Sequence, residues 1–345
     1  MPPLKILHLA AGNRWTGAAA PAFAEVEALR GAGVDAHYAY VGGYKLEAKL
    51  QHHDFAHPLI EKAQNPFSFA RSVQALRRLI EGHGFDVVHA HLTYDHWLAR
   101  FAVNGRTTRI ARTFHARRVL RSDPFTHSLL RRTEHCFVIN NAFRLVERQA
   151  VFTPPPVDHR QFHPDGDNVR NAYGIAPTDK LLCVIGKLSK DRGFELALET
   201  LAELPEVKLM IIGHGEHRPA LEAHAAQLGV TPRVIWAGYH EDDLAEHYRA
   251  ADALLFTARG SDEGHRAVLE AMACGVPPAV APIEGIDALV PPQLIAAHHN
   301  AQSIAAVARD VLEGQDSALR TAVFEQSRNF GYAAAAERLI AAYTL

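Results

Sequence analysis

Thr153-Pro154-Pro155-Pro156 interrupts a regular alternation of strands and helices and divides the 345-residue chain into two halves. Because consecutive prolines cannot enter a helix or a central strand, this stretch and the polar residues up to about 170 are expected to form a linker. A chain of this length is expected to form about two domains, each with its own core. We expect domains at 1–160 and 161–328, with a last helix at 329–345 that packs back on the first domain.

Short apolar runs alternate with helix-length segments on both sides of the linker. Strands are expected at 5–10, 34–41, 85–90, 109–114 and 135–139, and then at 181–185, 208–212, 234–236, 253–256 and 278–281. Strands separated by helices of ten or more residues form parallel βαβ units. The expected fold class is therefore α/β, with two doubly wound Rossmann-like domains that face a central cleft. Ligands of such sheets bind outside the carboxyl ends of the strands.

The composition excludes several classes of protein. Hydrophobic residues make up 48% and charged residues 21%, which is typical of a globular chain. The net charge of −2 argues against a protein that coats nucleic acid. Cys136, Cys183 and Cys274 lie in apolar runs and are expected to be reduced packing residues. No signal peptide or membrane span is recognisable, so we expect a cytoplasmic protein.

Common cofactor and nucleophile motifs are missing from the sequence. There is no GxxxxGK[ST], GxSxG, HExxH or paired CxxC. Gly213-His214-Gly215 begins a GxGxxG pattern that fails at Arg218. A dinucleotide-dependent oxidoreductase is therefore disfavoured.

The most informative window runs from Gly260 to Pro277 and reads GSDEGHRAVLEAMACGVP. A strand leads into an acidic turn and then a helix, whose first N–H groups form a ready phosphate site. Asp262 and Glu270 would repel a phosphate unless they bind hydroxyl groups, a combination that suits a nucleotide diphosphate sugar. The alternative is that Asp262 caps the helix and Glu270 is a solvated face residue.

A second loop, Gly186 to Gly193, is expected at the same sheet edge. Its cations Lys187 and Arg192 could stabilise a pyrophosphate leaving group as its charge develops. Surface loops also carry such charges by chance.

Together these motifs resemble the retaining glycosyltransferases of family four, which have the GT-B fold. Asp262 to Glu270 matches the family's E-x7-E element, and Lys187 and Arg192 match the cations of its GRL…KG loop, interchanged. The remaining matches are Ile211 to Gly215 (IVGxG), Pro154 to Phe162 (PNGVDxxxF), Thr113-Phe114-His115 (TxH) and His89-Ala90-His91, a strand end at the cleft.

The resemblance implies a role for each matching residue. Four residues would be catalytic. Asp262 would contact the sugar hydroxyls, Lys187 and Arg192 would bind the pyrophosphate, and His115 would lie beside the donor or acceptor sugar. Glu270 would hold the ribose, and the other nucleotide-sugar residues would be Glu263, Gly264, His265, Arg266, Gly186, Gly213 and Gly17. On the acceptor side, in the first domain, would lie Trp15, Arg14 and His91. Trp15 could stack on a sugar or be a packing residue.

The same resemblance implies the reaction. The donor would be a UDP- or GDP-linked sugar and the acceptor a saccharide or a lipid-linked molecule, in surface polysaccharide or glycoconjugate synthesis. Transfer would retain the anomeric configuration, without a cofactor or a bound metal, because protein cations replace the metal.

Two departures from the family pattern keep an alternative open. Asp262 is one methylene shorter than the usual Glu, and Glu263 stands where Gly is usual; Asp262 is favoured as the working acid. Glu284 to Asp287 replaces a Gly-Gly segment. The alternative is a degenerate scaffold protein that binds sugar nucleotides without transfer.

Two further patterns carry weaker signals. Arg106 to Arg132 contains eight arginines and a single acid, Asp123. This segment could contact an anionic membrane from the inner face or a pyrophosphate-linked lipid, or it could be a solvated helix face. The chain has 22 histidines, but none has a partner at a recognisable metal-site spacing, so zinc is disfavoured.

Overall fold

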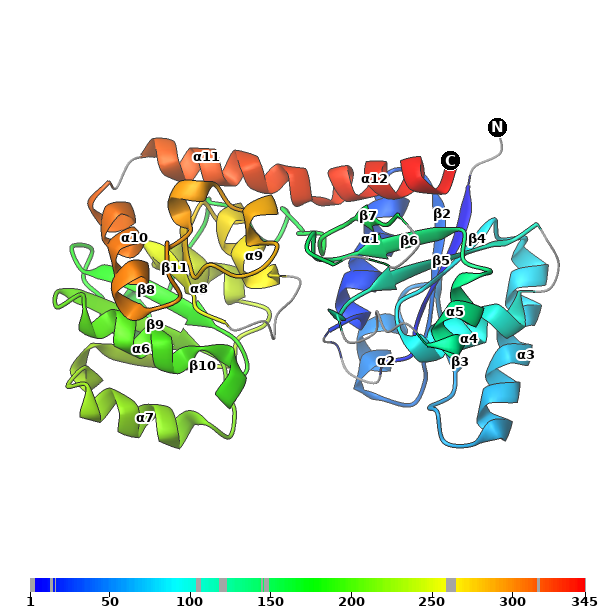
Figure 1. Ribbon diagram of the computed structural model, residues 1–345, viewed down its shortest axis with the longest axis horizontal. Helices are drawn as coiled ribbons and strands as arrows, with labels where there is room; N and C mark the ends of the chain where they lie inside the picture. Colours follow the sequence, from blue (N-terminus) through cyan, green and yellow to red (C-terminus); the bar gives the residue numbers. More distant parts are fainter. Residues whose placement is uncertain are drawn as a thin grey trace. The chain divides into compact units, whose positions relative to one another are not determined.

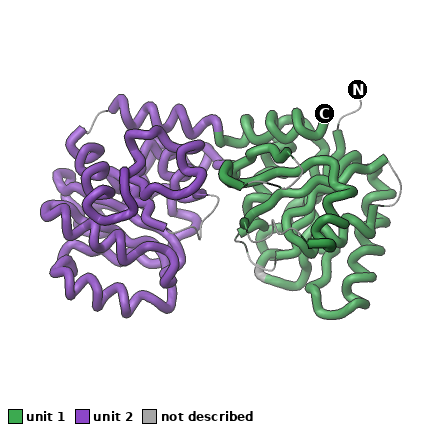
Figure 2. The backbone as a smooth tube through the Cα atoms, in the orientation of Figure 1, with its two compact units in different colours: residues 1–156, 330–345 green, residues 157–329 purple. Residues whose placement is uncertain are grey.

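The computed structural model describes residues 4–12, 15, 17–103, 107–117, 123–143, 145, 149–258, 265–314 and 317–344. The chain divides into two compact units, shown in Figure 2. Unit 1 comprises Met1–Pro156 and Phe330–Leu345, and unit 2 comprises Val157–Asn329.

Unit 1 is built on a parallel sheet in the order β3-β2-β1-β4-β5-β6-β7 (Figure 1). Its strands are β1 (Lys5–Ala10), β2 (Asp35–Val41), β3 (Ala56–Ile60), β4 (Val87–Ala90), β5 (Arg109–Phe114), β6 (His135–Val138) and β7 (Val151–Phe152). The strand order reverses between β1 and β4. Such a reversal opens a crevice at the carboxyl ends of the two strands.

Helices cover both faces of this sheet. On one face lie α1 (Ala19–Gly31), α2 (Lys45–Leu50) and α12 (Tyr332–Thr344), which share an apolar cluster with the sheet. On the other face lie α3 (Pro66–His83), α4 (Thr93–Ala102) and α5 (Pro124–Leu130). The C-terminal α12 packs beside α1 within unit 1 (Figure 1). Alanines on the two helices, Ala28, Ala335 and Ala336, allow this close contact.

Helix α3 shows how local sequence sets the bounds of these elements. Asn65 accepts a hydrogen bond from the Ser68 N–H at 2.9 Å, and the Ser68 hydroxyl lies 3.3 Å from the Asn65 N–H, which forms a capping box. Pro66 occupies the first turn, where no N–H is needed. The helix ends at Gly84, whose φ of 66° gives a left-handed cap.

Unit 2 has a second parallel sheet in the order β10-β9-β8-β11-β12. The strands are β8 (Lys180–Ile185), β9 (Val207–Ile212), β10 (Val234–Gly238), β11 (Ala253–Phe256) and β12 (Pro278–Val280). The helices are α6 (Phe194–Ala202), α7 (Arg218–Gln227), α8 (Leu244–Ala250), α9 (Arg266–Ala273), α10 (Ala301–Glu313) and α11 (Ser317–Ser327). Here the order reverses between β8 and β11. The two parallel sheets confirm the α/β class with two Rossmann-like domains.

Glycines let the carboxyl ends of three strands in unit 2 approach closely. Gly213 follows β9 with a φ of 144°, and a Cβ atom there would overlap the carbonyl oxygen of Gly186. Gly193, with a φ of 73°, lies against the carbonyl of Thr257 in the same way. No side chain fits at either position, so the loops after β8, β9 and β11 are drawn together by backbone contact.

This close approach predicts a large difference between two glycine substitutions. We expect Gly213→Ala to lower the free energy of unfolding by roughly 3 kcal/mol or more, because backbone overlap cannot be relieved by rotating a side chain. Gly229→Ala is the matched control: Gly229 has a φ of 70° but open space around it, so only about 1 kcal/mol of backbone strain is expected. Urea denaturation measures both, and equal losses would contradict the close approach.

Candidate active site

The loop after β8 carries two of the predicted catalytic cations. Gly186 follows the strand with a φ of 152°, and Lys187 comes next with an exposed side chain. The Lys187 Nζ lies 3.3 Å from the Glu216 carboxylate, and both groups are in solvent. Arg192 is half-buried at the end of a short 3-10 turn. Both cations thus follow β8 at the point where the strand order reverses.

Backbone hydrogen bonds hold this loop against the turn after β9. The Leu188 N–H donates to the His214 carbonyl at 3.0 Å, and the His217 N–H donates to the Leu188 carbonyl at 3.1 Å. The position of Lys187 is therefore set by two neighbouring strands.

Glu270 on α9 is buried, with 4% of its surface exposed. One carboxylate oxygen accepts from the Arg266 Nε at 2.5 Å, and the other accepts from the Tyr248 hydroxyl at 3.1 Å. Burial and the nearby Glu270 charge raise the pKa of Tyr248 well above its usual value, so its hydroxyl remains a donor. The alternative that Glu270 is a solvated face residue is wrong, because the α9 surface that carries it is packed against α8.

His265 precedes α9 in a strained backbone conformation. Its φ of 49° is the one positive value among the described residues other than glycine. The side chain is buried, packs edge-on against Phe256 at 5.7 Å and places Nε2 3.4 Å from the Glu284 carbonyl. Such backbone strain is concentrated at functional sites in proteins.

Several predicted site residues lie outside the described residues. They are Asp262, Glu263, Gly264 and Arg14. The choice between Asp262 and Glu263 as the working acid stays a prediction.

Four of the predicted site residues belong to unit 1 and are described: Gly17 from the nucleotide-sugar set, His115 from the catalytic set, and Trp15 and His91 from the acceptor side. Gly17 is exposed, with a φ of 62°. Trp15 is half-buried and packs edge-on against Phe23 at 5.4 Å, with the Lys49 Nζ 5.5 Å from its ring centre. The geometry supports the packing role for Trp15. His115, after β5, is half-buried.

His91 is fully buried, so it has no surface with which to touch an acceptor. Its Nδ1 lies 3.0 Å from the His115 Nε2, and its Nε2 lies 2.9 Å from the His8 Nδ1. His91 can therefore act on a ligand only through His115. Burial, with a contribution from the Arg112 charge, lowers the pKa of His115 to about 3, so its ring is neutral.

Sequence reasoning missed the cluster to which His91 belongs. His8 on β1 pairs in register with His89 on β4, and both face α1, where Glu25 lies. All four groups are 0–1% exposed. Burial lowers the pKa of His8 to about 3 and raises that of Glu25 to about 8, although the Arg338 charge opposes the second shift. The available signal was a histidine at an inward position of an apolar strand.

The Arg106 to Arg132 segment is less uniform than expected. Arg112 is 2% exposed inside the core, so it does not belong to a basic surface. Burial lowers the pKa of Arg112 to about 10, and the nearby Asp95 carboxylate opposes that shift. Arg117, Arg131 and Arg132 are exposed, whereas Arg106, Arg118 and Arg121 lie outside the described residues.

Comparison with known proteins identifies the class. The model for Glycosyltransferase Family 4 matches residues 15–146, and that for Glycosyl transferases group 1 matches residues 165–335. The two Rossmann-like sheets are those of the GT-B fold, which the solved glycosyltransferase structures share. The chain belongs to the group 1 glycosyltransferases of family 4, and the resemblance is confirmed.

The alignments to curated relatives cover only part of each chain. The chain is 34% identical over 138 residues to the GDP-mannose-dependent alpha-(1-6)-phosphatidylinositol monomannoside mannosyltransferase of Mycolicibacterium smegmatis, covering 36% of each chain. It is 28% identical over 200 residues to the D-inositol 3-phosphate glycosyltransferase of the same organism, covering 55% of this chain and 46% of the relative. The chain thus spans less than half the length of the first curated relatives it matches.

Solved structures share the whole fold. A glycosyltransferase from Rickettsia africae matches with a TM-score of 0.82 and 15% identity, covering 100% of this chain and 98% of the other. The Anabaena protein HepE, solved in complex with UDP-glucose, matches with a TM-score of 0.78 and 17% identity over 99% of both chains. Among the described residues, no helix combines the length and apolar character needed to cross a lipid bilayer.

The burial of Glu270 predicts a stability difference between two similar ion pairs. Arg266–Glu270 and Arg218–Glu222 are both i,i+4 pairs, but Glu222 is exposed on α7. We expect Glu270→Gln to lower the free energy of unfolding by about 2 kcal/mol, because it removes the charge of a buried carboxylate that accepts hydrogen bonds from Arg266 and Tyr248. Glu222→Gln should cost about 0.5 kcal/mol or less. Urea denaturation compares them, and equal small losses would mean that Glu270 is not held as described.

Proposed function

We propose that the protein transfers a sugar, with retention of anomeric configuration, from a UDP- or GDP-linked donor to a saccharide or lipid-linked acceptor. The observation that carries the proposal is the strand reversal of unit 2, between β8 and β11. The loop after β8 offers Lys187 and Arg192, and α9, the helix that follows β11, offers the buried carboxylate of Glu270.

The chemistry of these groups suits a nucleotide diphosphate. Glu270 has its two oxygens fixed by Arg266 and Tyr248, and each oxygen keeps a lone pair that a ribose hydroxyl can use. Lys187 and Arg192 would offset the charge that develops on the pyrophosphate as the sugar–oxygen bond breaks. The new bond would form on the same face of the sugar, and the acceptor proton would pass to the departing phosphate oxygen. These cations would replace a metal ion at the pyrophosphate.

The names of two similar proteins suggest two nucleotides that the donor could carry. The Mycolicibacterium smegmatis mannosyltransferase is named as GDP-mannose-dependent, and HepE was solved with UDP-glucose. We therefore propose UDP and GDP as the candidate nucleotides and leave the sugar to be screened.

The first test is a thermal-shift series with UDP, GDP, CMP and NAD. A ligand at a hundred times its dissociation constant adds about 2.7 kcal/mol of stability, so UDP or GDP should raise the melting temperature clearly. A response to NAD alone, or to none of the four, would contradict the proposal.

A second test removes a cation from the loop. Lys187→Ala should lower turnover about a hundredfold, because a contact made in the transition state is lost. Lys180→Ala removes the same charge at the opposite end of β8 and should leave turnover unchanged. Unaltered turnover in Lys187→Ala would refute the assignment, and nucleotide binding without any transfer by the wild-type chain would favour a non-catalytic scaffold.

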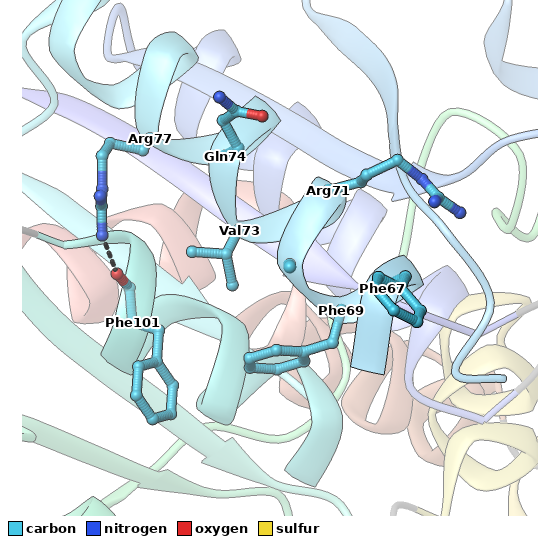
Figure 3. Close-up of a pocket in the computed structure, with 8 residues that line it drawn as sticks. Phe67, Phe69, Arg71, Val73, Gln74, Arg77 and Phe101 are labelled. Carbon is cyan, nitrogen blue, oxygen red and sulfur yellow. Dashed lines mark hydrogen bonds between the residues drawn. The ribbon is translucent and has the colours of Figure 1, made fainter. Parts of the chain in front are cut away.

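We also propose that the face of unit 1 formed by α3, α4 and α5 contacts an anionic membrane surface that holds a lipid-linked acceptor. Phe67, Phe101 and Phe125 expose 74%, 49% and 72% of their surfaces on these helices. Figure 3 shows a shallow pocket between α3 and α4, where Phe67, Phe69 and Phe101 lie between two arginines. Exposed apolar rings beside cations suit the boundary between lipid headgroups and acyl chains.

Two arginines at this face are engaged by neighbouring groups, and two others are exposed to solvent. Arg71 is paired with Glu61 at 2.6 Å, and Arg77 donates to the Phe101 carbonyl at 2.7 Å (Figure 3). Arg131 and Arg132, directly after α5, are exposed. The latter pair would supply the attraction to an anionic lipid, at about 1 kcal/mol for each charge.

Vesicle sedimentation tests this contact. Wild-type protein should bind vesicles that contain phosphatidylglycerol and not those of phosphatidylcholine alone. The double variant Arg131→Glu, Arg132→Glu should lose most of this binding, whereas Arg309→Glu, Arg328→Glu in unit 2 changes the net charge equally and should bind as wild type. If both double variants lose vesicle binding equally, binding depends on net charge alone, and the proposed contact face is wrong.

A further inference from the structure

Four potential metal ligands meet in the core of unit 1. They are His8 from β1, Glu25 from α1, and His89 and His91 from β4 and the residues just after it, and each is 0–1% exposed. One ligand atom from each lies within 4.8 Å of all the others. We propose that this cluster binds a zinc-type divalent cation through three imidazole nitrogens and one carboxylate oxygen.

The distances are close to those of a four-coordinate site. The Glu25 Oε2 lies 3.6 Å from the His8 Nδ1, 3.7 Å from the His91 Nε2 and 4.0 Å from the His89 Nδ1. The His8 and His91 nitrogens are 2.9 Å apart. Zinc bonds of about 2.0–2.1 Å in a tetrahedron separate ligand atoms by about 3.3 Å. The observed separations lie on either side of this value, so small side-chain movements suffice.

The outer ring nitrogens of two histidines already have partners. The His89 Nε2 lies 2.7 Å from the Thr113 hydroxyl, and the His91 Nδ1 lies 3.0 Å from the His115 Nε2. When these outer nitrogens donate, the inner nitrogens present lone pairs to the centre. Metal-binding histidines are oriented in this way in proteins.

The cluster also contains polar atoms that a cation would satisfy. Among the described residues, the buried Glu25 Oε2 has no hydrogen-bond partner. An unsatisfied buried acceptor costs about 1–3 kcal/mol, and more when it is charged. The Arg338 charge acts on Glu25 from α12 and offsets part of its charge. A cation at the centre would coordinate the oxygen directly.

Tyr343 on α12 closes the cluster. Its hydroxyl lies 2.5 Å from the His89 Nδ1, the nitrogen that faces the centre. On metal binding this hydroxyl would give up that nitrogen to the cation and remain beside it. Because all four ligands are buried and come from the chain itself, the site has the character of a structural site that joins β1, α1 and β4.

The ligand set indicates the class of metal. Imidazole nitrogens suit zinc and neighbouring transition metals, whereas Mg²⁺ and Ca²⁺ prefer sites built from oxygen atoms alone. The site uses unit 1 residues only and does not depend on the proposed donor chemistry of unit 2.

Metal analysis of the full chain tests the proposal. The wild-type protein is expressed with zinc in the medium and then washed with a chelator, which removes zinc bound weakly to exposed histidines. It should contain about one zinc per chain by mass spectrometry. Glu25→Gln, which keeps the shape of the side chain, and His91→Gln should each lower the zinc affinity about a hundredfold or more. His240→Gln is the control, because it alters a different group, His240, Asp243 and His247, and should leave the tightly held zinc in place.

A second measurement does not depend on how the variants fold. Wild-type protein refolded with Co²⁺ should show the visible absorption of a four- or five-coordinate site, and refolding with Zn²⁺ should raise the melting temperature above that of metal-free protein. The proposal is overturned if the wild-type chain holds less than a tenth of an equivalent of metal and its melting temperature does not respond. It is also overturned if Glu25→Gln folds and retains the metal. In those cases the four groups form a metal-free hydrogen-bond network.

Discussion

The parallel pairing of a central strand with neighbours on both sides is the constraint on which each unit depends. In unit 2, β8 pairs with β9 and β11, and this brings the loops after all three strands to one edge. The carbonyl of Gly186 then lies against Gly213, and the carbonyl of Thr257 lies against Gly193. Each contact is so close that only glycine fits at positions 213 and 193. In unit 1, β1 pairs with β2 and β4, and the register of β1 with β4 sets His8 beside His89.

Much of this architecture could be predicted from the sequence, because buried parallel strands are apolar runs that are easy to recognise. The edge strand β3 was missed, since His57 and Pro58 within it do not resemble a buried strand. Burial of charged groups was harder to predict. Arg112 was assigned to a basic surface, yet it shares a sheet face with Ile110 and Phe114, and its charge is compensated by Asp95.

The candidate site residues also divide into those that could be predicted from the sequence and those that could not. Lys187, Arg192 and Glu270 could be located because each follows a recognisable strand, and the fold requires their loops to meet. The cluster of His8, Glu25, His89 and His91 could not be found by spacing, because its members are contributed by three elements spread over more than 80 residues. Only the register of β1 with β4 and the packing of α1 bring these groups together, and both are properties of the tertiary structure.

The same cluster explains why the C-terminal helix belongs to unit 1. A buried imidazole needs a partner for each ring nitrogen, and one partner of His89 is the Tyr343 hydroxyl, 254 residues later in the chain. The alanine contact between α1 and α12 provides packing, whereas Tyr343 also satisfies a polar atom in the core. Because His89 and Glu25 lie between the sheet and α1, the polar interior of unit 1 is completed only when the end of the chain has docked. Docking of α12 therefore contributes a polar partner as well as apolar packing to the core of unit 1.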